Sequence, residues 1–278
     1  MTGTTAAGTG PAGPATEPDG LLLLLTGPLQ SWGERSLYGD RDTAAWPTLS
    51  GITGLFASAL GMSRNDDLGL FGSFVVTVRA DRPGVPLVDF QTAGTADPGG
   101  IAKASGKRGG EDRTVVGHRH YLADAAFVVA VDLPAGQTMS SPAASTLDRV
   151  AVALARPRWA PYLGRRGCPP GYPVLLGRTA GPAAPHLDTI PVLAAGARDG
   201  QPGKTVTVIR ETDDPTRTAT VSNDRPAGFG SRTRSYTPRR LEHDTTRPPA
   251  AGTGLTGYRT LLEAARAAGN HTRPQDTP

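Results

Sequence analysis

The sequence predicts an α+β domain made of two β-α-β units with a long insertion between them. Short apolar runs of strand length stand at Leu21–Leu25 and Ala126–Leu133. A stretch with the apolar spacing of a helix follows each run, and each helix is followed by a further candidate strand. The glycine-rich excursion Thr92–His120 separates the two units. An excursion of that length in a compact domain is either functional or disordered.

In the first unit, Leu21–Leu25 is too short for a helix and too apolar for a surface strand, so it predicts a strand covered on both faces. The helix begins after Pro47, with Thr48 or Ser50 as its cap. Its buried stripe follows the i, i+3, i+4, i+7, i+8 rhythm at Ile52, Leu55, Phe56, Ala59 and Leu60. Alternation over Phe74–Arg79 then predicts a half-buried strand.

In the second unit, the strand Ala126–Leu133 leads to Ser141 and Pro142, a capping residue and a first-turn proline. The helix they open buries the stripe Leu147, Val150, Ala151 and Leu154. The strand Val174–Leu176 closes the unit. This order is the ferredoxin-like arrangement, which RNA-recognition motifs also use.

Composition divides the chain into segments. Small polar residues and prolines predict disorder at the N-terminus, and the same composition predicts a mostly disordered C-terminal tail in which Leu255–Ala268 could form a weakly amphipathic helix. Beyond the second unit, Lys204–Arg210 predicts a strand with which Thr218–Ser222 could pair. The predicted parts are a tail (1–19), the ferredoxin-like domain (20–177) with its insertion (92–120), a β-rich extension (178–243) and the second tail (244–278).

The charge pattern points to a polyanionic partner. The formal net charge is only +4, but residues 156–178 and 225–240 each hold five arginines and no acidic residue. A local positive field attracts a polyanion more effectively than the total charge does. The single cysteine, Cys168, excludes an internal disulfide framework and a cysteine-rich zinc site. Together with the lack of a secretory signal or a membrane-length apolar run, this predicts a cytoplasmic protein without a membrane partner.

The loop after the first strand, GPLQSWGERSLYGDR, is one candidate RNA-binding segment. It gathers hydrogen-bonding groups, cations and rings at Gln30, Ser31, Trp32, Arg35, Tyr38 and Arg41. The alternative is an ordinary strand-to-helix connection with a tryptophan in the core. Ser50 lies at a capped helix N-terminus, where backbone donors could hold a phosphate or where the cap could be purely structural.

Two further candidates are the insertion and the segment PRWAPYLGRRGC, residues 157–168. The insertion carries Lys103, Lys107, Arg108, Arg113 and Arg119, which could bind RNA or be a solvated loop. The segment holds Arg158, Trp159, Tyr162, Arg165 and Arg166 among stiff turns. Such turns suit guanidinium contacts to phosphate and ring contacts to bases. The alternative places the two rings in a core and the arginines on the surface.

Catalysis has a single candidate. His118 and His120, beside Tyr121 and near Lys107, could support a metal-independent ribonuclease. The pattern favours the alternative, two surface histidines in a basic loop. The sequence holds no paired carboxylates, Walker loop, GxGxxG motif or zinc-ligand spacing, so no cofactor or metal is expected.

Several of these motifs occur together in one known family. They are an apolar strand followed by GPLQSWG, then WPTLSGITGLFASALGMSRNDD, YLADAAFVVAV, ARPRWAPYLGRRGCP and SYTPRRLEH. The sequence resembles the CasD family over most of Leu21–His243. Members of this family are the CRISPR-associated subunits of the type I-E Cascade complex that hold the 5′ end of the crRNA.

The resemblance implies a repeat-associated (RAMP) fold on a ferredoxin-like domain, with residues 92–120 as a β-hairpin thumb. It implies a non-catalytic role in antiviral defence: binding the repeat-derived 5′ handle, with contacts to the adjacent backbone subunit and the large subunit. Target DNA would be met only through the complex. The alternatives are a metal-independent endoribonuclease, as in related type I-C members, and a protein–protein adaptor that needs no RNA.

Overall fold

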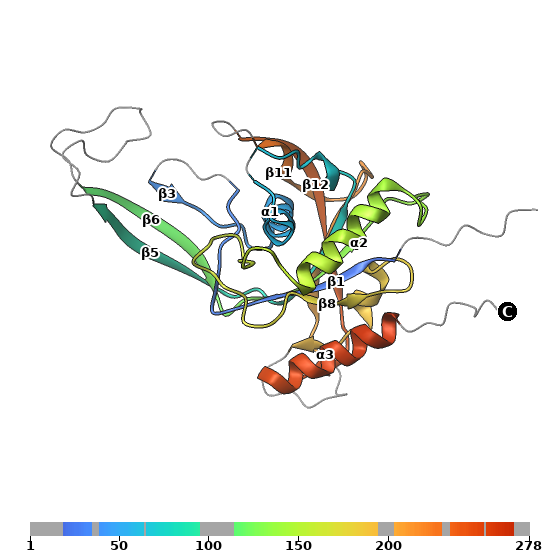
Figure 1. The fold of residues 1–278 in the computed structure, drawn as a ribbon. Coiled ribbons are helices and arrows are strands. Elements are labelled where there is room, and N and C mark those ends of the chain that lie inside the picture. Colours follow the sequence, from blue (N-terminus) through green and yellow to red (C-terminus); the bar gives the residue numbers. More distant parts are fainter. Residues whose placement is uncertain are drawn as a thin grey trace, which may run out of the picture.

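The centre of the protein is a large antiparallel sheet. The computed structural model describes residues 19–34, 39–63, 65–94, 114–193, 203–229, 234–252 and 254–269. Within them, seven strands form one sheet in which every neighbouring pair is antiparallel (Figure 1). In spatial order they are β11 (Ala219–Phe229), β12 (Arg234–Thr246), β10 (Val206–Glu211), β4 (Val75–Arg82), β7 (Ala126–Asp132), β1 (Leu21–Thr26) and β8 (Leu175–Arg178).

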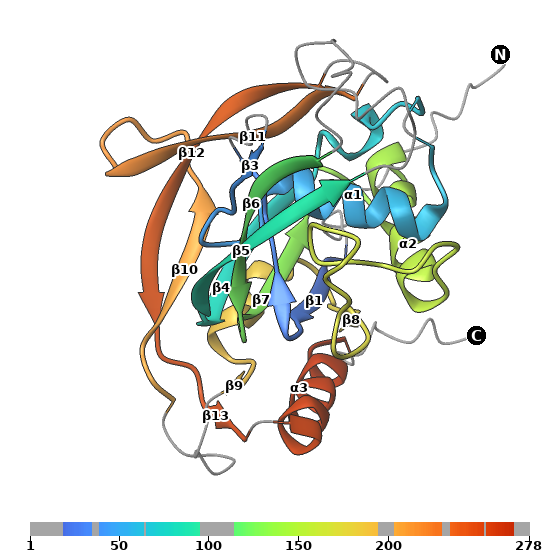
Figure 2. The same ribbon diagram turned by 90° about the vertical axis from the view of Figure 1, so that its left-hand side faces the viewer.

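Helices cover both faces of this sheet. Helices α1 (Leu49–Leu60) and α2 (Pro142–Ala155) lie on one face, and α3 (Gly254–Gly269) lies on the other (Figure 2). The α3 side also carries short elements, namely η2 (Ala184–Asp188), β9 (Val192–Leu193) and β13 (Ala250–Ala251); η1 (Gly69–Phe71) precedes β4 on the α1 and α2 side. The predicted α+β class is therefore confirmed.

Strand β1 shows why two covered faces need a continuous apolar run. All six of its residues are buried. Leu21, Leu23 and Leu25 belong to the core beneath α1 and α2, whereas Leu22 and Leu24 belong to the core beneath α3. Alternate side chains of a strand point to opposite faces, so each face receives leucines. The predicted covering of this strand on both faces is confirmed.

The two helices on the first face begin and stop where their end residues allow. Thr48 caps α1 by accepting a hydrogen bond from the amide of Gly51, and Gly61 ends it in the left-handed conformation at φ 73°. Ser141 accepts from the amide of Ala144 at 3.1 Å, with Pro142 as the first residue of α2. Both predicted caps and both predicted apolar stripes are confirmed, except that Leu60 is only half-buried.

The alternation of residues in β4 predicted a half-buried strand, but the structure covers this strand on both faces. Arg79 is completely buried and forms an ion pair with Asp81, with 2.7 Å between Nε and Oδ1. Its guanidinium also donates to the carbonyls of Leu187, Ile190 and Pro191. The chain around η2 thus covers the second face of β4, and the arginine is buried because every polar direction it offers has a partner.

The C-terminal region contains more structure than its composition predicted. The predicted strand at Lys204–Arg210 is β10, but the segment Thr218–Ser222 falls at the start of β11 and pairs with β12 rather than with β10. The prediction of a mostly disordered tail from residue 244 is wrong for its first part, whereas the helix considered within it at Leu255–Ala268 is confirmed as α3. Strand β12 continues to Thr246, and α3 buries Leu261 and Ala265 completely.

This error has a physical cause. Most of the apolar stripe of α3 consists of small residues, which give a weak hydrophobic signal but allow the helix to lie close to the sheet. Gly177 of β8 lies directly beneath Ala265. Tyr258, which shares this face, stacks on Tyr172 with ring centroids 4.6 Å apart.

At the other end of the chain, residues 1–18 of the predicted N-terminal tail lie outside the described residues. The Asp19 carboxylate accepts a hydrogen bond from the amide of Gly181.

A second, smaller sheet extends from the body. Strands β5 (Val85–Gly94) and β6 (Thr114–Ala123) form an antiparallel hairpin in continuous register from Val85–Ala123 to Gly94–Thr114 (Figure 1). The short strands β2 (Leu29–Gln30) and β3 (Asp40–Arg41) pair with the other side of β6. The paired strands begin before the predicted insertion at 92 and continue past 120. Residues 95–113 lie outside the described residues.

Candidate nucleic-acid interface

One arginine connects three segments that are distant in the sequence. Arg165 lies in the loop between α2 and β8, and its Nη2 donates to the carbonyls of Arg41 at 2.6 Å and Asp42 at 3.1 Å. The guanidinium carbon lies over the ring of Tyr121 on β6, 5.1 Å from the centroid. This cation–π contact and the two hydrogen bonds fix the loop against β3 and β6.

The loop around Arg165 is a tight turn that is hydrogen-bonded to the segment after β1. The amide of Leu163 donates to the carbonyl of Cys168, and the amide of Cys168 donates to the carbonyl of Arg165, both at 2.8 Å. The carbonyl of Leu163 accepts from the amide of Ser31 at 3.1 Å. Leu163 and Cys168 are completely buried beneath the turn. Burial raises the pKa of the Cys168 thiol, while the nearby charge of Arg165 opposes that shift.

Glycine is required at one position of this turn. Gly164 has φ +82°, and a Cβ there would lie 1.8 Å from the carbonyl oxygen of Ser31. No L side chain fits that space without a backbone shift. By contrast, a Cβ on Gly167, in the same turn, would meet nothing within 4 Å. The rigidity that the sequence predicts for this segment therefore comes from contacts such as that of Gly164 with the Ser31 carbonyl, and not from its glycine content alone.

Three exposed arginines lie on the turn and on the two strands that Arg165 contacts. Arg41, Arg119 and Arg166 are exposed, and none forms an ion pair with a residue in the described ranges. Arg41 and Arg119 are register partners on β3 and β6, so their like charges lie side by side. Arg119 also projects from the same face of β6 as Tyr121, two residues later. Asp89 on β5 is the register partner of Arg119 on its other side, so an anion at this surface is favoured most on the Arg41 side of Arg119.

Trp159, Tyr162 and Arg158, which precede the turn in the same loop, differ in how far their side chains are exposed. Trp159 is 47% exposed, and Tyr162 is half-buried. Arg158 is exposed and lies across Gly61 at the end of α1. Trp159 thus retains a ring surface on which a base could stack.

Gln30, Ser31 and Trp32 lie beneath this surface. All three are at most 1% exposed. Gln30 Nε2 donates to the carbonyls of Leu25 and Ala125, and Gln30 Oε1 accepts from Trp32 Nε1 at 3.0 Å. Ser31 Oγ donates to the carbonyl of His120 at 2.8 Å. The expectation of direct RNA contact is therefore corrected for these three: they hold the strand-to-helix connection in place.

The N-terminus of α1 is already occupied by a carboxylate. The amide of Leu49 donates to Asp224 Oδ2 at 2.7 Å, and Asp224 pairs with Arg239, 2.6 Å from Nε to Oδ1. Ser50 Oγ lies 3.3 Å from Thr48 Oγ1. The hypothesis of a phosphate at this helix end is corrected, because Asp224 supplies the negative charge that the helix dipole favours. No local sequence signal links Asp224 to a helix 175 residues earlier.

Two of the five arginines in the second basic cluster, residues 225–240, pair with carboxylates. Arg225 Nη2 lies 2.5 Å from Glu211 Oε1, and Arg239 pairs with Asp224. The acidic partners come from other strands, so the cluster is acid-free only in sequence. Six predicted site residues lie outside the described residues: Arg35, Tyr38, Lys103, Lys107, Arg108 and Arg113.

The histidines lie on the other face of β6. His118 and His120 alternate with Arg119 and Tyr121, so they project away from Arg165. His120 Nε2 lies 2.9 Å from Asp40 Oδ1, and the ring of His118 contacts that of Phe90 edge-on.

Within the described ranges, no group of three or more His, Cys, Asp or Glu residues could hold a metal ion. No helix in the described part of the chain is long and apolar enough to span a membrane.

Comparisons with known proteins define the class. The model of the family described as CRISPR-associated protein (Cas_Cas5) matches residues 20–242. CRISPR system Cascade subunit CasD of Escherichia coli (strain K12) is 35% identical over 162 residues, which are 56% of this chain and 70% of that protein.

Solved structures agree with that class. A chain of a "CRISPR RNA-guided surveillance complex" is 38% identical with a TM-score of 0.71, covering 89% of this chain and 99% of its own. A "Crystal structure of Cas protein" is 31% identical with a TM-score of 0.60, covering 82% and 95%. The chain belongs to the CRISPR-associated Cas_Cas5 family. The resemblance to CasD that the sequence motifs indicate is confirmed.

Proposed function

We propose that the protein is a non-catalytic RNA-binding subunit of a type I-E Cascade complex that caps the crRNA at its repeat-derived 5′ handle in antiviral defence. Family membership and the similarity to a Cascade subunit support this role. The observation that carries it is the Arg165 contact, which fixes a rigid turn bearing exposed Arg166 against the two strands that bear exposed Arg41 and Arg119. This arrangement gives phosphates several guanidinium donors in fixed positions.

The proposed binding mode follows from these positions. Single-stranded RNA is held by cations along its backbone and by stacking of its bases on exposed rings. The three exposed arginines would contact phosphates, and Trp159 would stack on a base. Arg165 covers the ring of Tyr121, so this ring acts through the arginine and not directly on RNA.

The fold detail belongs to the same proposal. The four strands in the order β8-β1-β7-β4, with α1 and α2 on one face, support a ferredoxin-like RAMP domain. We propose that the β5–β6 hairpin is the thumb, including the segment with Lys103, Lys107, Arg108 and Arg113. The partners would be the adjacent backbone subunit and the large subunit, in the cytoplasm, with target DNA met only through the complex.

A footprint tests the handle assignment. The complex is assembled with crRNA, and the acylation of each ribose 2′-hydroxyl is compared with that of free crRNA. We expect protection at the 5′ handle, and an Arg119→Ala, Arg166→Ala variant should lose that protection while the 3′ end is unaffected. Equal reactivity of the handle in the free and bound RNA would refute the assignment.

A further inference from the structure

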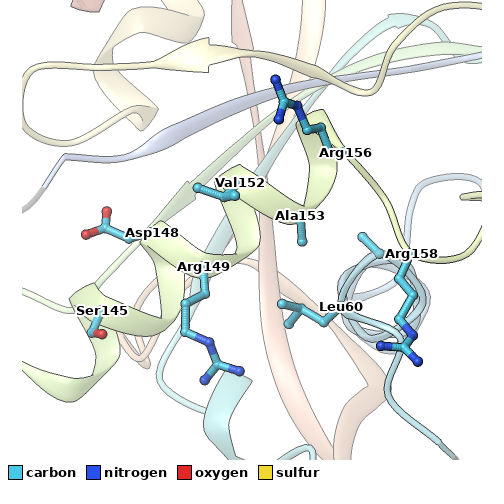
Figure 3. Close-up of a pocket in the computed structure, with 9 residues that line it drawn as sticks. Leu60, Ser145, Asp148, Arg149, Val152, Ala153, Arg156 and Arg158 are labelled. Carbon is cyan, nitrogen blue, oxygen red and sulfur yellow. The ribbon is translucent and has the colours of Figure 1, made fainter.

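A shallow cavity lies between α1 and α2, on the helical layer of the protein. Its volume is about 500 Å³. Figure 3 shows Leu60 between the side chains of Arg149 and Arg158, with Ala153 and Val152 on the adjoining part of α2. None of the contacts described above for the loop turn, β3 or β6 uses this cavity, except that Arg158 begins the loop.

Three arginines line the cavity. Arg149, Arg156 and Arg158 all line it and are exposed, and none has an acidic partner within the described part of the chain. Asp148, which also lines it, forms an ion pair with Arg178 of β8. The local charge is therefore positive, and the three guanidinium groups are available to an anion.

The surface between these cations is apolar. Val152 is 68% exposed although it lies on a helix of the core layer, and Leu60 and Ala153 are half-buried beside it. Protein interfaces combine an apolar centre with arginines, and an exposed apolar patch rimmed by charge is typical of a docking surface. Single-stranded RNA would instead use aromatic rings for stacking, and none of the described residues that line this cavity is aromatic.

We propose that the cavity docks an acidic segment of another protein subunit. Carboxylates of that segment would pair with Arg149 and Arg158, and an apolar side chain would cover Leu60 and Val152. This proposal rests on the proposed function, because the partner is taken to be another subunit of the same complex. It places the contact between the two subunits at this cavity and predicts a partner segment with carboxylates around an apolar side chain.

The test uses the assembled complex with its crRNA. A photo-crosslinking amino acid replaces Ser145, an exposed residue of the cavity wall, and the crosslinked product is identified by mass spectrometry. In parallel, an Arg149→Glu, Val152→Asp variant is titrated with the subunit that crosslinks. Both substituted side chains are exposed, so the fold should be unaffected. Arg259→Glu, at an exposed arginine of α3 on the other face of the sheet, is the matched control.

We expect a crosslink to a Glu- or Asp-rich segment, and affinity for that subunit roughly tenfold weaker in the double variant. The control should bind normally, and a Glu→Lys change in the partner segment should restore binding to the variant. A crosslink to crRNA would overturn the proposal in favour of an RNA surface. Unchanged affinity in a complex that retains its crRNA would overturn the proposal alone. A wild-type complex without crRNA would overturn the proposed function and this proposal with it.

Discussion

Two neighbouring arginines in the loop between α2 and β8 have different roles, although the sequence presents them as a pair. Arg165 is half-buried and engaged with the carbonyls of Arg41 and Asp42 and with the ring of Tyr121. Arg166 is exposed without a partner among the described residues. Because the two differ in their contacts, replacing each should change different properties.

Replacement of Arg166 by alanine should weaken handle binding without lowering the melting temperature. The log–log dependence of affinity on salt should flatten by roughly 0.7 for one lost phosphate contact to single-stranded RNA. Arg165→Ala should also lower the melting temperature, because it releases the turn from β3 and β6. Titrations at several salt concentrations, with thermal unfolding, separate the two. An Arg166→Ala variant with unchanged affinity and slope would remove that residue from the site.

The two tryptophans considered for RNA stacking should also behave differently. Trp32 is completely buried, so Trp32→Ala should destabilise the fold by about 3–5 kcal/mol. Trp159 is 47% exposed, so Trp159→Ala should leave stability nearly unchanged and weaken handle binding by about 1–3 kcal/mol if a base stacks on it. Denaturant unfolding and RNA titration measure the two effects. Equal losses of stability in both variants would contradict this assignment.

At the residue scale, the sequence indicates chemical type better than position. The motif QSW offers hydrogen-bonding groups and a ring, but the three residues turn inward because the connection after β1 must satisfy its own backbone. Alternation places Arg79 on the exposed face of its strand, yet Arg79 forms a buried pair with Asp81. Asp224 at the end of α1 could not be foreseen, because its contact depends on the packing of β11.

At the scale of elements, the loop turn of residues 163–168 can be tested with two glycines. Gly164→Ala places a methyl group against the carbonyl of Ser31 at positive φ, and should destabilise the protein by more than about 1 kcal/mol. It should also loosen the turn, so that the buried Cys168 thiol reacts faster with an alkylating reagent and handle binding weakens.

Gly167→Ala is the matched control, since its new Cβ meets nothing within 4 Å. It should leave the alkylation rate of Cys168 and the affinity for RNA close to those of the wild type. Similar behaviour of the two variants would show that the turn is not held by the contact between Gly164 and Ser31. Mass spectrometry of the alkylated protein over time gives the rates.

Elements with local signals were predictable, and elements defined by long-range pairing were not. Helices α1 and α2 have a capping residue and an apolar stripe within a single window of sequence. Strands β11 and β12 contain arginines, prolines and glycines, and they are stabilised by ion pairs to Glu211 and to each other. The local propensity of a segment carries no information about partners that are distant in the sequence.

For the whole molecule, the order of elements was predictable because the apolar runs and helix caps that mark most of them are local in the sequence. The placement of α3 over the second face was not, because its small residues gain burial only once β1 and β8 are assembled. The exposed arginines of the turn, β3 and β6 stand on neighbouring segments for a similar reason. They come from three segments that only the finished sheet brings into contact.

The whole molecule also bears on catalysis. His118 and His120 face away from the Arg165 turn, and Asp40 engages His120, so we expect no cleavage of RNA bound at the turn. Purified protein incubated with labelled repeat RNA, with and without chelator, should leave it intact. Metal-independent cutting that His118→Ala or His120→Ala abolishes would establish the ribonuclease instead.

The most direct test of the central claim is the identity of the RNA that the protein carries. The tagged protein is expressed with its native neighbours and the CRISPR repeats, and the RNA that copurifies is sequenced. We predict short RNAs that share one repeat-derived 5′ leader, with recovery reduced in the Arg119→Ala, Arg166→Ala variant. Recovery of no RNA, or of a random sample of cellular RNA, would contradict the proposal that this chain caps the crRNA handle.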